Sequence, residues 1–294
     1  MSTLDHKIDF AVVLSVHNAN PNGDPLNGNR PRQNYDGYGE ISDVCLKRKI
    51  RNRLQDMGLS LLVQSDERRS DGHRSIKDRV DANAAVQEFA KGKKTNIELY
   101  AQVACKEWID VRSFGQVFAF SGGGEAGGGV SIGVRGPVSI HAAVSVDPID
   151  ISSLQITKSV NSTTPAGDPN KKGSDTMGMK HRVDFGLYVF YGSINTQLAE
   201  KTGFTEEDAQ HIRQALTTLF ENDTSSARPD GSMEVHHVYW WEHNSKLGQY
   251  SSAKVHRSLQ LKKKEQVETA RSYDDYEVIV QPLDGLEVQT YEGL

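Results

Sequence analysis

The segment that most constrains the fold is residues 8–16 (IDFAVVLSV), near the start of the 294-residue chain. It is rich in β-branched residues and bounded by polar ones, a pattern that predicts a buried strand. Residues 234–241 and 276–280 are predicted to be later strands. A helix is predicted to begin at Thr205, because Thr205 and Asp208 match a capping box. With a further helix and further strands in between, this order indicates an α+β fold with antiparallel character.

A basic helix is predicted from Asp43 to about Met57, with Ser42 or Asp43 as its N-cap and Gly58 at its end. Since no opposite charge stands at i+4 from its cations, we expect them to be exposed and to repel one another until an anion binds. A phosphate backbone is one interpretation, and an ordinary solvated helix face is the other. The apolar stripe consists of Leu46, Ile50, Leu54 and Met57. The cations are Lys47, Arg48, Lys49, Arg51 and Arg53.

Two long polar stretches interrupt the predicted core. Residues 64–94 are charge-mixed and are expected to be an insertion away from the main core. Residues 161–180 lie between predicted strands at 154–160 and 181–192, which favours a projecting β-hairpin. A ferredoxin-like core, βαββαβ, is expected if both stretches are insertions.

Two loops could bring the backbone close to a phosphate. Residues 18–25 (NANPNGDP) follow a strand directly and have small polar side chains, although an ordinary turn is the alternative. Asp24 within them could be a metal ligand or a general base, but no second carboxylate is suitably spaced for metal catalysis. Residues 122–129 (GGGEAGGG) lack the GK[ST] ending of a P-loop, so we expect either a connector or a place where an RNA backbone passes.

Composition and missing motifs exclude several classes of protein. No run of 18 apolar residues is present, the first residues do not match a secretory signal, and Cys45 and Cys105 lie far apart, so we expect a cytoplasmic protein without a membrane segment, disulfide or zinc site. His236 and His237 are adjacent in a predicted strand and point to opposite faces, so they cannot easily share a metal with His243. GxSxG and HExxH are absent. We therefore expect no catalytic residue, metal or cofactor.

Charge is unevenly distributed along a chain whose net charge is −5. Residues 30–53 contain seven basic and three acidic residues, a balance of +4, and residues 158–182 contain five and two, a balance of +3. Residues 272–294 contain six acidic and no basic residues. Such a chain can hold a polyanion on one surface and repel it elsewhere.

Taken together and in order, several segments resemble one family, the Cas-seven backbone subunits of type I CRISPR Cascade surveillance complexes, with the type I-C branch as the best match. The segments are NANPNGDP at 18–25, SDVCLKRKIR at 42–51, DVRSFG at 110–115, IGVRGPV at 132–138, ITKSVN at 156–161, MGMKH at 177–181, YVFYG at 188–192 and WEHN at 241–244. None is specific alone, but the ordered set is.

The resemblance implies one hand-shaped domain over residues 1–294. Its palm would be a modified ferredoxin-like fold, similar to an RNA-recognition motif, with finger insertions that include residues 64–97 and a β-hairpin thumb at 157–184. It also implies a non-catalytic subunit that oligomerises head to tail along CRISPR RNA with other Cascade subunits and presents the guide for pairing with target DNA. The alternative is a metal-dependent ribonuclease of the related type III backbone lineage, for which Asp24 and Asp43 are the positions to check.

The resemblance also implies which residues contact RNA. Lys47 and Arg51 match helix positions that hold guide phosphates, and Met177 and Met179 are candidates for the thumb residue that displaces a base. The full predicted RNA-binding set is Asn18, Asn20, Asn22, Lys47, Arg48, Arg51, Gly122, Gly123, Gly124, Lys158, Met177, Met179 and Lys180.

Overall fold

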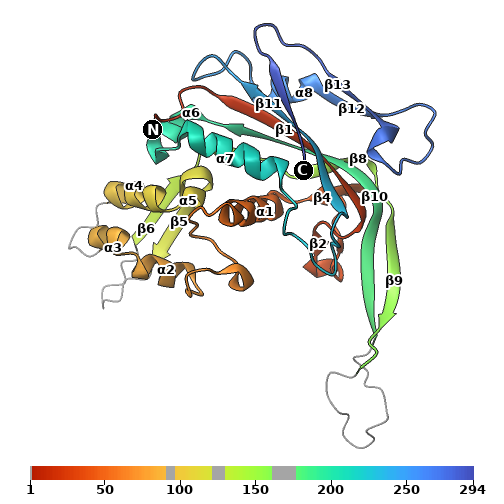
Figure 1. Ribbon diagram of the computed structural model, residues 1–294, viewed down its shortest axis with the longest axis horizontal. Helices are drawn as coiled ribbons and strands as arrows, with labels where there is room; N and C mark the ends of the chain where they lie inside the picture. The colour runs from red at the N-terminus through yellow and green to blue at the C-terminus, as the bar shows by residue number, and fades with distance from the viewer. Residues whose placement is uncertain (1, 91–96, 121–129, 161–176) are drawn as a thin grey trace, which may run out of the picture.

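The computed structural model describes residues 2–90, 97–120, 130–160 and 177–294, and its centre is a mixed α/β arrangement built on one antiparallel sheet (Figure 1). Strand β1 lies in the middle of this sheet and pairs antiparallel with β10 on one side and β11 on the other. The strand order is β14 (Val288–Glu292), β11 (Met233–Glu242), β1 (Ile8–Ala19), β10 (Met177–Ile194), β8 (Ala143–Pro148) and β4 (Tyr38–Ile41), with β7 (Val138–Ile140) and β9 (Ile151–Thr157) also paired to β10. The predicted α+β class with antiparallel strands is confirmed.

Strand β1 is mostly apolar because both faces of the sheet are covered along most of its length. Phe10, Val12 and Leu14 belong to the core beneath α1 (Asp43–Asp56) and α7 (Glu206–Thr217). The alternate residues Ala11 and Val13 belong to a second core on the opposite face. That face is covered by α8 (Ser252–Ser258), β12 (Leu259–Lys263) and β13 (Tyr276–Val280), which form the upper part of Figure 1.

The two predicted helices form because their end signals are local. Ser42 accepts a hydrogen bond from the Cys45 amide at the start of α1, and Gly58, just past its end, has a φ of +84°. Thr205 and Asp208 form the predicted capping box of α7. The predicted apolar stripe of α1 is confirmed as well, with Leu46, Ile50 and Leu54 fully buried and Met57 packed against them.

A smaller body with its own hydrophobic core lies beside the helical face (Figure 1). It contains α2 (Ile76–Ala82), α3 (Ala84–Ala90), α4 (Ile97–Glu107), α5 (Ile109–Phe114), β5 (Gly115–Phe120) and β6 (Val130–Arg135). Residues 64–94 contain two short helices that their polar composition did not predict, and these helices bury Val80 and Val86 in that core.

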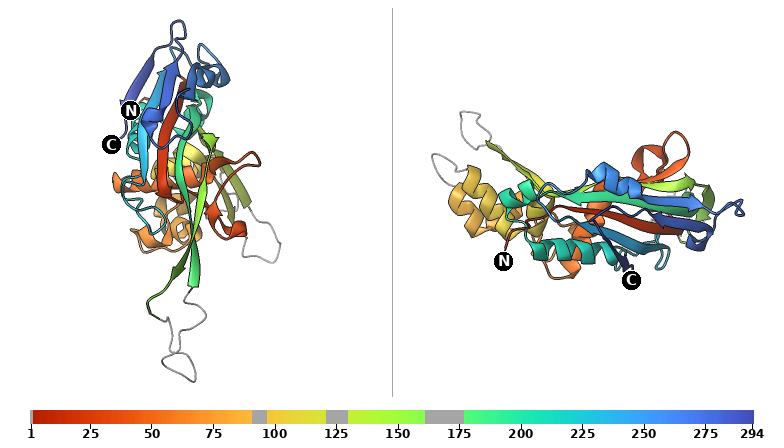
Figure 2. Two further views of the ribbon diagram at one scale, coloured as in Figure 1. Left: turned by 90° about the vertical axis from the view of Figure 1, so that its right-hand side faces the viewer. Right: turned by 90° about the horizontal axis from the view of Figure 1, so that it is seen from above.

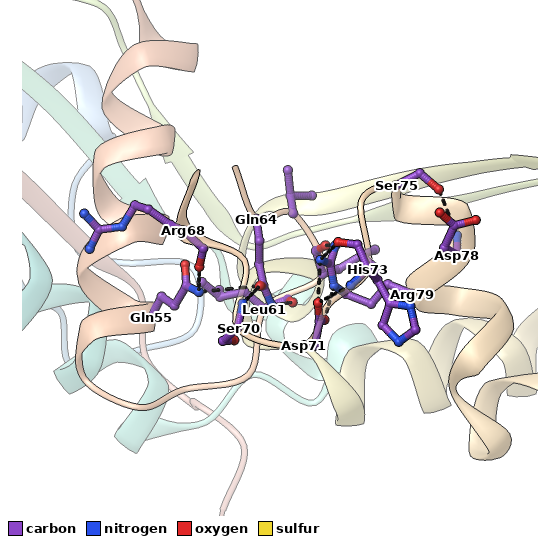
Figure 3. Close-up of polar contacts among 12 residues, drawn as sticks. Gln55, Leu61, Gln64, Arg68, Ser70, Asp71, His73, Ser75, Asp78 and Arg79 are labelled. Atoms are coloured by element: carbon purple, nitrogen blue, oxygen red, sulfur yellow. Dashed lines mark hydrogen bonds and ion pairs between the residues drawn. The ribbon is translucent and has the colours of Figure 1, made fainter. Parts of the chain in front are cut away.

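Polar contacts fix the loop between α1 and α2, and one of them joins that loop to the end of α1 (Figure 3). Gln55 on α1 donates to the Arg68 carbonyl at 2.6 Å. Arg79 on α2 donates to the Leu62 carbonyl at 2.7 Å and to the His73 carbonyl at 2.9 Å, and it pairs with Asp71. The hydrogen bonds from the Arg79 guanidinium lower the pKa of Asp71. The loop between α1 and α2 is therefore held in place by side chains rather than by secondary structure.

A two-stranded hairpin extends away from both bodies (Figures 1 and 2). β9 pairs with the outer half of β10 from Ile151↔Val183 to Thr157↔Met177, and the inner half of β10 is a strand of the central sheet. The predicted start of the returning strand at residue 181 is wrong, because β10 begins at Met177. Its partner ends at Thr157 rather than at residue 160. Residues 161–176 of the predicted arm lie outside the described residues.

The remaining elements are short. They are β2 (Gly23–Asp24), η1 (Pro25–Asn27), β3 (Arg30–Pro31), η2 (Asp66–Arg68), α6 (Thr196–Thr202) and η4 (Tyr273–Asp275). Among the described residues, no helix combines the length and the apolar character needed to cross a lipid bilayer.

Candidate nucleic-acid interface

The loop that follows β1 is fastened to the start of α1 by Asn22, and a second predicted asparagine, Asn20, is bonded within the loop. Asn22 Oδ1 accepts hydrogen bonds from the Ser42 amide and the Ser42 hydroxyl, both at 2.9 Å. Asn20 is buried and donates to the Asn29 carbonyl at 2.7 Å. Asn18 is exposed, with a φ of +53°. Asn18 is therefore the most exposed of the three side chains, while the buried Asn20 and the half-buried Asn22 shape the loop through their hydrogen bonds.

Carboxylates accompany four of the five cations of α1, so the expectation that they lack opposite charges is wrong. Lys47 lies 3.0 Å from Asp43, one turn earlier on the same helix. The other partners are Asp223 for Lys49, Asp110 for Arg51 and Asp56 for Arg53. Two of these carboxylates come from distant parts of the chain. The basic face of α1 is therefore largely neutralised by the fold itself.

Lys49 also contradicts the expectation that these cations are exposed, because it is 3% exposed. It pairs with Asp223, which also accepts a hydrogen bond from Arg228 at 2.9 Å. Burial lowers the pKa of Lys49, and the attraction of Asp223 only partly offsets that effect. Lys49 thus belongs to the contact between α1 and the segment after α7.

Arg51 is held on the side of α1 that faces the smaller body. Its Nε lies 3.2 Å from Asp110 Oδ2, and its guanidinium stacks 5.0 Å from the centre of the Phe114 ring. Asp110 is fully buried and also accepts from the Leu62 amide at 2.8 Å and the Val63 amide at 3.0 Å. This carboxylate therefore joins α1, α5 and the loop between α1 and α2.

Arg48 and Lys47 are half-buried, and neither pairs with a buried carboxylate. Arg48 donates to the Val63 carbonyl at 3.0 Å, and burial followed by the nearby charge of Arg51 lowers its pKa. Among the residues that the structure describes, Lys47 pairs with the surface carboxylate of Asp43 alone. A phosphate could replace that partner with little cost, because exposed ion pairs of this kind are weak.

The hairpin has two chemically different faces. Cross-strand partners in an antiparallel pair share a face, and successive residues alternate. Met179 opposite Gln155 therefore shares a face with Met177, while Lys180 opposite Leu154 lies on the other face. Both methionines are exposed, at 66% for Met177 and 56% for Met179. Lys180, predicted beside them, thus points away from the methionines.

Arg30 links the methionine face of the hairpin to the loop after β1. Its Nη1 donates to Ser153 Oγ at 2.9 Å and lies 3.3 Å from His181 Nδ1. A polar pocket beside it, of about 280 Å³, is lined by Asp24, Arg30 and Arg32 among others. The sequence-based set omits Arg30, and the only available signal was its place at the start of the basic segment 30–53.

The other predicted residues are placed as follows. Lys158 is exposed just after the end of β9. Gly122, Gly123 and Gly124 lie outside the described residues. Asp24 accepts from the Leu26 amide at 3.2 Å and lies 3.6 Å from Arg32, so this candidate base is engaged within the loop.

His236 and His237 on β11 and His243 just after it have separate partners. His236 lies 2.9 Å from Ser15 Oγ, His237 lies 3.2 Å from the Tyr273 hydroxyl, and His243 lies 2.9 Å from Asp9. Asp9 is fully buried. Burial raises its pKa, but hydrogen bonds led by that from His243 outweigh burial and leave the pKa below its usual value. The His243–Asp9 pair is buried on the face of the sheet opposite α1.

Comparison with known proteins gives one extended match. Residues 6–281 match the model of the family described as CRISPR-associated protein Cas7. A curated relative, the CRISPR-associated protein Cas7 of Haloferax volcanii, is 27% identical over 236 residues, which cover 77% of this chain and 67% of the relative.

Two solved chains are similar over 80% of this chain. One comes from a CRISPR RNA-guided surveillance complex in a pre-nicking state, with 17% identity, 75% of that chain covered and a TM-score of 0.48. The other comes from a CRISPR RNA-guided surveillance complex, with 16% identity, 68% of that chain covered and a TM-score of 0.45. Likeness at this level does not place individual residues.

Proposed function

Because the chain belongs to the CRISPR-associated Cas7 family, we propose that it is a non-catalytic backbone subunit of a type I Cascade complex, of the type I-C branch. It binds CRISPR RNA, and copies stack head to tail along that RNA together with the other Cascade subunits. The coated guide then pairs with target DNA in antiviral defence. The proposal places the protein in the cytoplasm and assigns it no cofactor.

In this proposal the architecture divides into a palm, fingers and a thumb within one hand-shaped domain. The strand order β11-β1-β10-β8, with α1 and α7 packed on one face, supports a ferredoxin-like palm similar to an RNA-recognition motif. The smaller body, which includes residues 64–97, is the finger region. The β9–β10 hairpin, within residues 157–184 and the strand that precedes them, is the thumb.

The observation that carries the proposal from the structure is the exposed methionine face of the hairpin, joined through Arg30 to the loop after β1. An apolar side chain on a projecting element can displace a base from a stack, and Met177 and Met179 are the candidates. Lys47, Arg48 and Asn18 are close along the chain to that loop and supply polar contacts to the backbone. Base pairing supplies specificity, so contacts to the RNA backbone suffice.

The test is to purify the full chain with and without CRISPR RNA and to image the assemblies by electron microscopy. We expect filaments of regular subunit spacing only in the presence of RNA, with an absorbance ratio at 260 and 280 nm that reports bound nucleic acid. Filaments of the same spacing from RNA-free protein would refute the guide-dependent assembly.

A separate assay tests the non-catalytic part of the proposal. RNA complementary to the guide is incubated with the assembly and Mg²⁺ or Mn²⁺, and we expect no cleavage. Asp24 lies 3.6 Å from Arg32 and Asp43 lies 3.0 Å from Lys47, so each carboxylate already has a cationic neighbour. Cutting at regular intervals that Asp24→Ala or Asp43→Ala abolishes would instead establish the type III-like ribonuclease.

A further inference from the structure

We propose that His6, Glu206 and Glu242 form a binding site for a divalent transition metal of the zinc type. The imidazole nitrogen and one carboxylate oxygen from each glutamate lie within 4.8 Å of one another. The three residues come from the segment before β1, the first turn of α7 and the end of β11. The proposed RNA-binding role does not require this cluster, so the two proposals can fail independently.

The imidazole of His6 is oriented as a metal ligand would be. Its Nδ1 lies 3.1 Å from Asp5 Oδ1, and a carboxylate at one ring nitrogen fixes the tautomer that leaves the other nitrogen free to bind a metal. That other nitrogen, Nε2, is buried and has no hydrogen-bond partner among the described residues. It lies 3.8 Å from Glu206 Oε2, too far for a hydrogen bond.

A cation resolves the electrostatics of this arrangement. When a divalent ion takes the place of a proton on Nε2, the imidazole lone pair and the two carboxylate oxygens can all bind to that ion. Zinc takes nitrogen and oxygen ligands at about 2.0–2.2 Å, which places tetrahedral ligand atoms about 3.3–3.5 Å apart. The distance of 3.8 Å between Nε2 and Glu206 Oε2 has to shorten by a few tenths of an ångström, and the distances to the Glu242 oxygen, which are at most 4.8 Å, by no more than about 1.5 Å. A water molecule completes the coordination.

The backbone around His6 is held on both sides, so the ligand is pre-positioned. The Leu4 amide donates to the Phe204 carbonyl at 3.0 Å, just before α7. The Lys7 amide donates to the Ser245 carbonyl at 3.1 Å, and the His243 amide donates to the Lys7 carbonyl at 2.9 Å, just after β11. A bound metal would therefore cross-link three segments that the backbone already brings together.

Some neighbours of Glu242 favour metal binding, and another opposes it. Trp240 Nε1 donates to Oε1 at 2.9 Å and Gln289 donates to Oε2 at 3.2 Å, which orients the carboxylate. Arg213 Nη1 lies 3.8 Å from Oε1 and competes with a cation for the same charge. Removal of the Arg213 charge should consequently tighten metal binding, an effect that nonspecific binding to scattered histidines would not show.

The experiment uses the full, untagged and RNA-free chain. Zn²⁺ is titrated by calorimetry, and Co²⁺ is titrated with its visible absorption as a second readout. We expect one equivalent of Zn²⁺, an affinity at least about tenfold lower in His6→Ala, and a higher affinity in Arg213→Gln. His73→Ala, on the loop before α2, is the matched control and should bind as the parent does. A hundredfold excess of Zn²⁺ over its Kd should raise the Tm by about 5 °C in the parent and not in His6→Ala.

Glu206→Gln keeps the shape of the first turn of α7 and serves as the second variant if His6→Ala does not fold. The proposal is overturned if the parent shows no saturable Zn²⁺ binding. It is also overturned if Zn²⁺ binds with the parent's affinity to both His6→Ala and Glu206→Gln.

Discussion

The buried ion pair of Arg51 and Asp110 yields a prediction whose size follows from the structure. The Arg51 side chain is 14% exposed and the Asp110 side chain is fully buried. Arg51→Ala removes a charged hydrogen bond and the stacking on Phe114. Within the described part of the chain, the carboxylate then keeps two backbone amides as hydrogen-bond donors. Breaking such a pair costs about 3–5 kcal/mol, and the remaining amides offset part of this cost, so we expect a loss of about 2–4 kcal/mol of unfolding free energy.

Lys47 gives the contrasting case on the same helix. Its pair with Asp43 is 26% and 43% exposed, so Lys47→Ala should change stability by no more than about 0.5 kcal/mol. If Lys47 contacts an RNA phosphate, Lys47→Glu should reduce the slope of log affinity against log salt by about 0.7, which amounts to about fourfold in affinity at 0.15 M salt. Lys201→Glu, an exposed lysine on α6, is the matched control for the charge change.

The assay is urea unfolding of the RNA-free chain at pH 7, followed by RNA binding at several salt concentrations. In thermal unfolding of the same chains, Arg51→Ala should lower the Tm by about 5–10 °C. In an Asp110→Asn background the same substitution should cost less than about 1 kcal/mol, because the buried charge is gone. An Arg51→Ala chain as stable as the parent, but with weaker RNA binding and a reduced salt slope, would refute the structural role and make Arg51 a phosphate ligand.

Three further predictions follow from other regions. Simultaneous Met177→Ala and Met179→Ala should leave unfolding free energy within about 0.5 kcal/mol of the parent, yet remove most of the fluorescence gain of 2-aminopurine in bound RNA; an unchanged gain would exclude them as the displacing residues. Burial lowers the pKa of His256 below its ordinary 6.5, so the neutral imidazole contributes fully to stability above pH 6.5 and loses that contribution as pH falls. The urea concentration at the midpoint of unfolding should therefore decrease when the pH is lowered below about 6.5, and it should decrease less in His256→Gln. Gly192→Ala should cost about 3 kcal/mol, because a Cβ there would clash with the Phe10 ring and the Ser139 carbonyl; a Tm equal to the parent's would contradict the register of β1 and β10.

The parts of the fold that were predicted correctly are those whose signals are local. The capping box at Thr205 spans four residues, and the apolar stripe that begins at Leu46 recurs every three or four residues. Both patterns can therefore be recognised in the sequence itself. The two helices of residues 64–94 were missed because they are short and mostly polar. Their few apolar residues are buried by contact with α4, which lies later in the chain.

The chemistry around the predicted cations could not be inferred from the neighbouring sequence. Lys49 and its partner Asp223 are 174 positions apart, and Arg51 and Asp110 are 59 apart. The cations of α1 were therefore predicted to be exposed, whereas the fold brings carboxylates from distant segments next to them. Spacing along the chain similarly could not show that Lys180 and Met179, although adjacent, lie on opposite faces of the hairpin.

The continuity of β10 has a mechanical consequence. One strand runs without interruption from Ile194, in the middle of the sheet, to Met177, about 20 Å beyond its last pairing with β1. A load applied at the outer end is carried into a strand that is clamped between β1 on one side and β7 and β8 on the other. The hairpin is thus a rigid extension of a strand held in the central sheet, with no loop at its base that could act as a hinge in β10. Repeated units built from it would inherit a spacing that resists bending.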